Sequence, residues 1–220
     1  MSVIDYLESD HNPNQPLSED LHDKLREDIL TGKLADREKL TEMNICNEYG
    51  ISRTPVRDAI HQLEVEGLVE TIPNRGAFVI GMTEQDIRDI FVLRAAGEIQ
   101  AVRWAVQRIT DDELDELDET FEFMEFYTMR NDIPKMININ NAFHQIIYHA
   151  THNRLMIRQL SDYQAYIRNA VPSNYYASNY LRNVLSEHRE IYEAIKSKDV
   201  EAGAQAMQNH MERSTIRKSK

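Results

Sequence analysis

The glycines of this chain are few and unevenly placed, and their placement constrains the fold more than any other feature of the sequence. The 220 residues contain seven glycines, and five of these fall within the first 81 positions. Glycine provides many of the turns of a β-rich fold, so the glycine-poor remainder predicts long helices. Hydrophobic residues make up 41% of the chain, enough to build a buried core. We therefore expect a mainly α protein.

The cysteine content and the start of the chain bear on its location. The single cysteine, Cys46, excludes an internal disulfide and is typical of a reducing compartment. No run of residues approaches the roughly 18 apolar positions of a membrane span. The first ten residues lack the basic and apolar parts of a signal peptide. We expect a cytoplasmic protein that does not contact a membrane.

The N-terminal part begins with a tail and continues with three short helices. Polar residues and two prolines over residues 1–17 predict a flexible tail. An apolar stripe at helical spacing follows, with Ser18 as the expected cap of the first helix. Two further helices are expected from about Thr41 to Tyr49 and from Arg53 to about Glu66, the second of them capped by Ser52.

A hairpin is expected directly after these helices. The segments 68–72 and 77–80 predict two strands, and the turn between them carries the sequence Pro-Asn-Arg-Gly at residues 73–76. Three helices and a hairpin in this order predict a winged helix-turn-helix domain over residues 18–81.

Residues 82–220 contain no pattern typical of a strand and predict an all-helical bundle. Each break between the expected helices carries a capping residue or a proline. The helices are expected to begin near Thr83, Thr110, Pro134, Asn153, Ser173 and Asp199.

Charge alone argues against non-specific binding to nucleic acid. The net charge is −12, and residues 1–82 hold 8 Lys and Arg against 16 Asp and Glu. Arg53, Thr54 and Arg57 nevertheless lie at the start of the third helix, away from its apolar face. Such residues suit contacts to base edges in the major groove. The alternative is that both arginines are solvated surface residues paired with Asp58 or Glu64.

The run Ser-Arg-Thr-Pro-Val-Arg at residues 52–57 closely resembles the GntR family of bacterial transcription regulators. The similarity continues through residues 63–69 and 73–79. It implies that the third helix contacts operator DNA in the major groove and that the hairpin turn forms a wing tip near the minor groove. The residues it assigns to DNA binding are Ser52, Arg53, Thr54, Arg57, Arg75 and Gly76.

Two positions depart from the family pattern. Ala35-Asp36 stands where the family usually has Pro-Gly, which we expect to alter only a loop. Met43 stands where some members place a DNA-contacting arginine, so one contact is expected to be missing.

Three of the eight histidines are placed at helical spacing among apolar residues. His144, His188 and His210 lie in three different expected helices, and each is predicted to point inward. Helical bundles build metal sites in this way, and imidazole suits zinc, nickel, copper or iron. For any one of these residues, the alternative is a histidine that is hydrogen-bonded within the core.

The C-terminal part resembles the FCD subgroup of GntR regulators, which carries an all-helical effector-binding and dimerisation domain. Metal-binding members use an aspartate one turn before the first of three histidines. Carried over, the ligands of a divalent metal such as zinc or nickel are Asn140, His144, His188 and His210. Asn140 replaces the aspartate, so the occupied site keeps one more positive charge and would favour an anionic ligand.

Arg94 is expected on the buried face of the helix that begins near Thr83. It either forms an ion pair with Glu98 one turn later or holds the carboxylate of a bound ligand. Effectors of the subgroup are often small organic acids, so the resemblance favours Arg94 as an effector-binding residue.

These expectations combine into a homodimeric transcription regulator, a repressor, that is not an enzyme. It would bind palindromic double-stranded operator DNA and respond to a small organic acid through the metal-containing helical domain. Two alternatives remain: a metal-dependent hydrolase that uses the three histidines, and a regulator whose pocket holds no metal.

Overall fold

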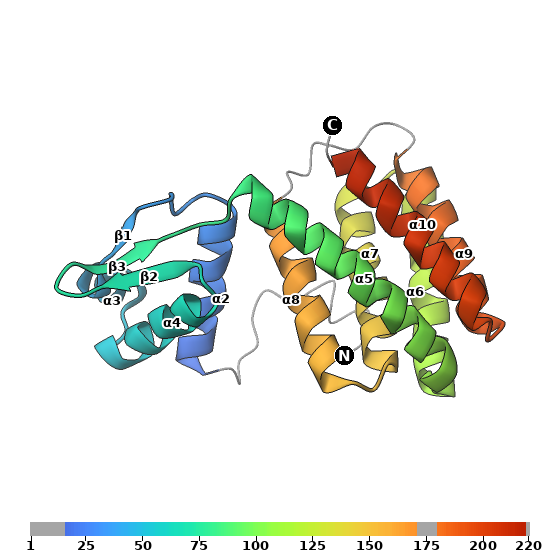
Figure 1. Ribbon diagram of the computed structural model, residues 1–220, viewed down its shortest axis with the longest axis horizontal. Coiled ribbons are helices and arrows are strands. Elements are labelled where there is room, and N and C mark those ends of the chain that lie inside the picture. The colour runs from blue at the N-terminus through green and yellow to red at the C-terminus, as the bar shows by residue number, and fades with distance from the viewer. Residues whose placement is uncertain (1–15, 171–179, 219–220) are drawn as a thin grey trace. The chain divides into compact units, whose positions relative to one another are not determined.

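The computed structural model describes residues 16–170 and 180–218 of the chain. Most of the predicted tail and the helix start predicted near Ser173 lie outside this part. The chain forms two compact units that separate between Ile87 and Arg88. Figure 1 shows the helices and strands of both units.

Three helices form the framework of the first unit. They are α2 (Leu17–Leu30), α3 (Glu42–Tyr49) and α4 (Arg53–Val65). Apolar residues of α2 pack against α4, where Val56, Ala59 and Leu63 have no exposed surface. The predicted cap at Ser18 is wrong, because α2 already begins at Leu17 and Pro16 occupies the cap position without a side-chain hydrogen bond. α3 ends at Tyr49 as predicted, and Gly50 after it adopts a left-handed conformation.

The hairpin is confirmed, and it belongs to a three-stranded sheet. β2 (Val69–Ile72) pairs antiparallel with β3 (Gly76–Val79), with Val69 opposite Val79. A short strand that sequence patterns did not predict, β1 (Lys39–Leu40), pairs with the other edge of β3. The strand order is therefore β1-β3-β2, with β3 in the centre. Two residues are too few for a recognisable alternation, so only the pairing with β3 defines β1.

The described part of the second unit is helical, as predicted. Its elements are α5 (Glu84–Arg108), whose first turn still belongs to the first unit, and α6 (Asp111–Met129), α7 (Ile133–Ala150), α8 (Arg154–Ala170), α9 (Tyr180–Lys196) and α10 (Val200–Lys218). α6 packs against α7 and α9, and α9 packs against α10. The predicted caps hold at two helix starts: Thr83 exchanges hydrogen bonds with Asp86, and Thr110 exchanges them with Glu113.

Two glycines allow close helix packing in this unit. A Cβ atom at Gly97 of α5 would lie 2.7 Å from a methyl group of Leu160 on α8. A Cβ atom at Gly203 of α10 would lie 2.8 Å from a methyl group of Val102 on α5. The absence of a side chain at these two positions lets α8 and α10 approach α5 closely.

Candidate nucleic-acid interface and metal centre

The two faces of α4 differ as the sequence predicted. Val56, Ala59, Ile60 and Leu63 are buried, whereas Ser52, Arg53, Thr54 and Arg57 are exposed at its N-terminal end. Ser52 occupies the N-cap position, but its side chain makes no capping hydrogen bond. The first turn of a helix presents backbone N–H groups and a partial positive charge, which favour a bound phosphate or base acceptor.

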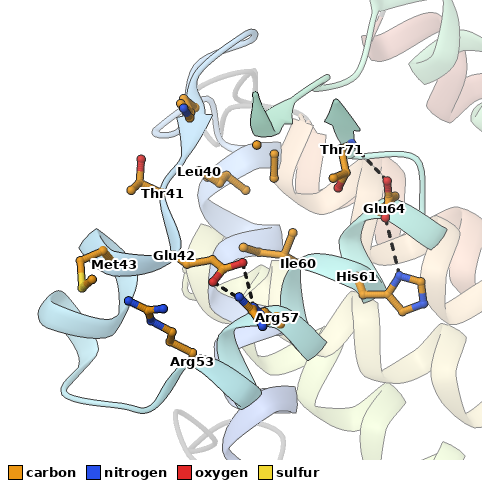
Figure 2. A pocket seen from close by; sticks show the side chains of 13 residues that line it. Leu40, Thr41, Glu42, Met43, Arg53, Arg57, Ile60, His61, Glu64 and Thr71 are labelled. Atoms are coloured by element: carbon orange, nitrogen blue, oxygen red, sulfur yellow. Dashed lines mark hydrogen bonds and ion pairs between the residues drawn. The ribbon is translucent and has the colours of Figure 1, made fainter. Parts of the chain in front are cut away.

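A groove of about 460 Å³ lies beside this helix end (Figure 2). It brings three of the predicted DNA-binding residues together: Arg53 and Arg57 from α4, and Gly76 from β3. Glu42 and Met43 line it from the first turn of α3. The predicted residues Ser52, Thr54 and Arg75 are exposed in the same unit but do not line this groove.

The cations of the first unit fall into two groups. Arg26, Lys33 and Arg37 pair with acidic side chains: Glu66, Asp28 and Glu70, respectively. In contrast, Lys39, Arg53 and Arg75 form no salt bridge with any described residue. Lys24 of α2 is likewise exposed and without a salt bridge among the described residues. The other three cations that remain available for an external anion lie on β1, at the start of α4 and in the hairpin turn.

Arg57 has a partner that the sequence analysis did not name. Its Nε atom donates to both carboxylate oxygens of Glu42, each at 3.0 Å. The predicted alternative partner, Glu64, instead accepts a hydrogen bond from the backbone N–H of Thr71 at 3.1 Å, and this contact lowers the pKa of Glu64. The alternative that pairs Arg57 with Asp58 or Glu64 is therefore wrong.

The hairpin turn needs glycine at its end. Gly76 has φ +100, which side chains other than glycine rarely adopt, and a Cβ atom there would lie 3.1 Å from Cε of Lys39. Lys39 and Arg75 both lie over the ring of Phe78, at 5.8 and 5.9 Å from its centroid. The turn thus has no side chain at Gly76, next to the cations Lys39 and Arg75.

The three predicted histidines converge inside the second unit. His144 of α7, His188 of α9 and His210 of α10 are buried, and their potential ligand atoms all lie within 4.8 Å of one another. The ring centroids of His188 and His210 are 4.5 Å apart, and the other two pairs are 5.3 and 5.4 Å apart. The interpretation of all three as inward-pointing is therefore confirmed.

Each of these rings is held by a hydrogen bond from its Nδ1 atom. His144 bonds Oε2 of Glu98 at 3.0 Å, His188 bonds the carbonyl oxygen of Val184 at 2.8 Å, and His210 bonds Oε2 of Glu187 at 2.9 Å. Carbonyl and carboxylate oxygens accept, so Nδ1 carries the proton in each case. In the neutral form of each ring, the lone pair therefore lies on Nε2, which is the usual arrangement of metal-binding histidines.

Burial favours the neutral form of at least one ligand. It lowers the pKa of His210 to about 4, against the opposing effect of the hydrogen bond with Glu187. At neutral pH this ring is thus ready to donate its lone pair. The donor set fits a divalent ion such as zinc or nickel, because three imidazoles bind these metals and leave coordination positions open.

Glu98 connects the histidines to Arg94. It has no exposed surface, and it accepts hydrogen bonds from Arg94 (Nε, 2.9 Å), the hydroxyl of Tyr148 and His144. Burial opposes ionisation of Glu98, but attraction to His144 and Arg94 and the hydrogen bonds hold its pKa at about 2. Arg94 therefore forms the ion pair that was one of the two expectations for it.

Asn140 lies half-buried on α7, one turn before His144. Two partners in this region were missed: Tyr148, and Glu187, which binds His210. A signal for Glu187 was present, since it occurs three residues after Val184 and four before Ile191, on the apolar face of α9.

Family models match both units. The model of the bacterial regulatory proteins of the gntR family matches residues 17–79, and that of the FCD domain matches residues 89–213. The chain belongs to the GntR family and carries an FCD domain. This confirms the resemblance found in the sequence and the predicted fold class, a winged helix-turn-helix followed by a helical domain.

The similar proteins are transcription regulators of bacteria. The chain is 27% identical over 191 residues to the HTH-type transcriptional regulator YdhC of Bacillus subtilis, covering 86% of this chain and 85% of YdhC. It is 24% identical over 206 residues to the HTH-type transcriptional repressor RspR of Escherichia coli, covering 94% and 90%. This GntR protein is therefore a DNA-binding transcription regulator and not an enzyme, and the hydrolase alternative is set aside.

Solved structures show the same fold. The structure of McbR/YncC of Escherichia coli matches with a TM-score of 0.71 at 22% identity, covering 92% of this chain and 96% of that one. A structure of the Listeria monocytogenes protein Lar matches with a TM-score of 0.68 at 19% identity, covering 94% and 99%. Among the described helices, none combines the length and apolar composition needed to cross a membrane.

Proposed function

We propose that this regulator binds a two-fold symmetric, double-stranded operator as a homodimer and represses transcription in the cytoplasm. The observation that carries the DNA assignment is the position of its unpaired cations. Lys39, Arg53 and Arg75 keep their charge available on one unit whose other cations mostly pair with acids. A symmetric dimer would present two such faces to two half-sites. Repression is proposed from the similarity to RspR.

In this proposal the residues of α4 and those of the hairpin contact different grooves of the DNA. Ser52, Arg53, Thr54 and Arg57 enter the major groove, where an arginine can donate two hydrogen bonds to the O6 and N7 atoms of guanine. Arg75 and Gly76 approach the minor groove, because a turn without a side chain at residue 76 lets the backbone come close to DNA.

Selection of duplexes from a randomised pool, followed by affinity measurements, tests this assignment. Arg53→Ala and Arg57→Ala should each weaken binding to the best selected duplex by about ten-fold or more and leave the fold intact. Arg37→Ala is the matched control, because Arg37 is an exposed arginine of the same unit that pairs with Glu70. If both α4 variants bind as tightly as wild type, α4 is not the recognition helix.

We further propose that the second unit binds one divalent metal, zinc, nickel or similar. His144, His188 and His210 would hold it, with Asn140 as a fourth ligand. The support is that all three rings bind oxygen acceptors through Nδ1. When bound, the metal supplies a positive charge that favours an anionic ligand.

Binding of a small organic acid beside this centre would control DNA binding. Arg94 is the residue we assign to the effector, because its guanidinium lies next to the Glu98–His144 pair. Effector binding would favour one arrangement of the two recognition helices over others. The remaining alternative is a regulator whose histidines line a pocket without metal.

Thermal unfolding with a panel of small carboxylates separates these two forms of the proposal. A carboxylate that binds only the folded protein raises its melting temperature. The metal proposal expects this rise in the presence of zinc or nickel and its loss after chelation. An equal rise with and without metal would favour the metal-free pocket.

A further inference from the structure

An acidic side chain lies in the middle of the proposed DNA-binding face. Glu42 is the first residue of α3 and lines the groove together with Arg53 and Arg57 (Figure 2). A carboxylate here repels the phosphates of DNA, so it weakens binding to any duplex unless its charge is compensated. Glu42 cannot attract DNA, so we consider another role for it on this face.

Glu42 holds Arg57 across the turn between two helices. The Nε atom of Arg57 donates to both oxygens of Glu42 at 3.0 Å, and this hydrogen bonding raises the pKa of Arg57 further above its usual range. Among the described residues, only Glu42 forms a hydrogen bond or salt bridge with the guanidinium of Arg57. Its two terminal nitrogens, Nη1 and Nη2, therefore remain available while its Nε side is turned toward α3.

This contact selects how Arg57 can meet a base. A guanidinium can donate a pair of hydrogen bonds either from Nε and one terminal nitrogen or from the two terminal nitrogens. Because Glu42 occupies Nε, only the second pair remains. That pair is the one that can approach the O6 and N7 atoms of a guanine end-on.

Arg53, one turn earlier on α4, provides the internal comparison. It lines the same groove but forms no salt bridge with any described residue. Arg53 must therefore lose side-chain freedom when it binds, whereas the orientation of Arg57 is restricted beforehand. Restricting a side chain in advance reduces the entropy lost on binding.

We infer that Glu42 is a positioning residue that orients Arg57 for base recognition and, through its negative charge, weakens binding to DNA without the matching base. Specificity is the difference between the affinity for the matching duplex and the affinity for other DNA. Glu42 would raise the first by orienting Arg57 and lower the second through its negative charge. The inference rests on the proposed role of α4 as the recognition helix. If the Glu42–Arg57 pair were purely structural, it would contribute a small amount to stability and nothing to the choice of duplex.

A double-mutant cycle on the full-length protein tests this inference. Wild type, Glu42→Gln, Arg57→Ala and the double variant are titrated with the best selected duplex and with a scrambled duplex of the same composition. Glu48→Gln is the matched control, because it removes the same charge from an exposed position of α3. Circular dichroism and thermal unfolding confirm that each variant is folded.

We expect Glu42→Gln to lower the ratio of selected to scrambled affinity by about ten-fold, and Glu48→Gln to leave this ratio unchanged. In the Arg57→Ala background, Glu42→Gln should cost no further affinity for the selected duplex. The inference about Glu42 is overturned if Glu42→Gln changes the affinity for both duplexes equally. It is also overturned if Glu42→Gln lowers the affinity for the selected duplex as much in the Arg57→Ala background as in wild type. Neither result contradicts the proposed role of α4. If Arg57→Ala itself binds the selected duplex like wild type, both the role of Arg57 and that of Glu42 are overturned.

Discussion

The Nδ1 atom of His144 lies 3.0 Å from Oε2 of Glu98, and this contact joins the histidine cluster to a buried ion pair. His144 lies on α7 and Glu98 on α5. The orientation of the proposed metal ligand His144 therefore depends on α5, a helix that carries no proposed metal ligand. His210 is held in the same way by Glu187. Hydrogen bonds of this kind fix the ring and increase its basicity as a ligand.

Glu98→Gln should therefore lower metal affinity by about 10- to 100-fold, because the amide no longer provides a negative charge behind His144. Competition with a chelating dye measures this, with zinc as the added metal. Glu187→Gln should have a similar effect through His210. Glu201→Gln, which removes a surface carboxylate paired with Arg103, is the control. Unchanged affinity in both buried variants would contradict a supporting role for these carboxylates.

Asn140→Asp should raise metal affinity, because a charged oxygen replaces a neutral one at the position where the subgroup has aspartate. His188→Ala should abolish metal binding, since two imidazoles remain. Elemental analysis after gentle purification, combined with the same dye competition, checks both. Full metal content in His188→Ala would refute the three-histidine site.

Arg94→Ala should destabilise the second unit by about 3–5 kcal/mol, because it leaves the carboxylate of Glu98 buried without its ion-pair partner. Glu98 is 0% and Arg94 is 6% exposed, so water cannot replace the lost contact. Urea unfolding followed by the fluorescence of Trp104, which lies on the same helix α5, measures the change. A variant that stays within about 1 kcal/mol of wild type would show that the ion pair between Arg94 and Glu98 does not stabilise the fold.

The stability of the first unit should fall as the pH rises toward 9. Hydrogen bonds from His22 to Asp23 and Glu66 raise its pKa from 6.5 to about 9. A pKa that is higher in the folded state stabilises the fold fully below pH 6.5, and this contribution is lost as the pH passes through 9. We expect a loss of about 1–2 kcal/mol, allowing for screening by solvent.

Titration of the ring protons of His22 by NMR checks this, with His22→Gln used to assign the signal. Glu66→Gln should move the midpoint back toward the ordinary value for histidine. A midpoint near 6.5 in the wild-type protein would show that neither carboxylate holds a protonated His22.

Local patterns in the sequence predicted those features that depend on one helix or one turn. The spacing of apolar residues placed His144, His188, His210 and Arg94 on buried faces, and the caps at Thr83 and Thr110 marked two helix starts. The motif at residues 52–57 predicted the family, because that motif lies within a single helix and its cap.

Features that depend on contacts between distant segments could not be predicted in this way. Arg57 and Glu42 belong to different helices, and Glu98 lies 46 residues before His144. No periodicity links such positions, because their contact follows from how the helices pack. The strand β1 was missed for the same reason, since only its pairing with β3 defines it.

The central place of β3 in the sheet has a consequence for synthesis of the chain. β1 and β2 each pair with β3, which is the last of the three to leave the ribosome. Helices α2, α3 and α4 emerge earlier and can pack before the sheet exists, since domains fold as units from the N-terminus during translation. The three-stranded sheet can thus be completed only after these helices have emerged, and a chain interrupted before residue 76 would carry α4 without β3.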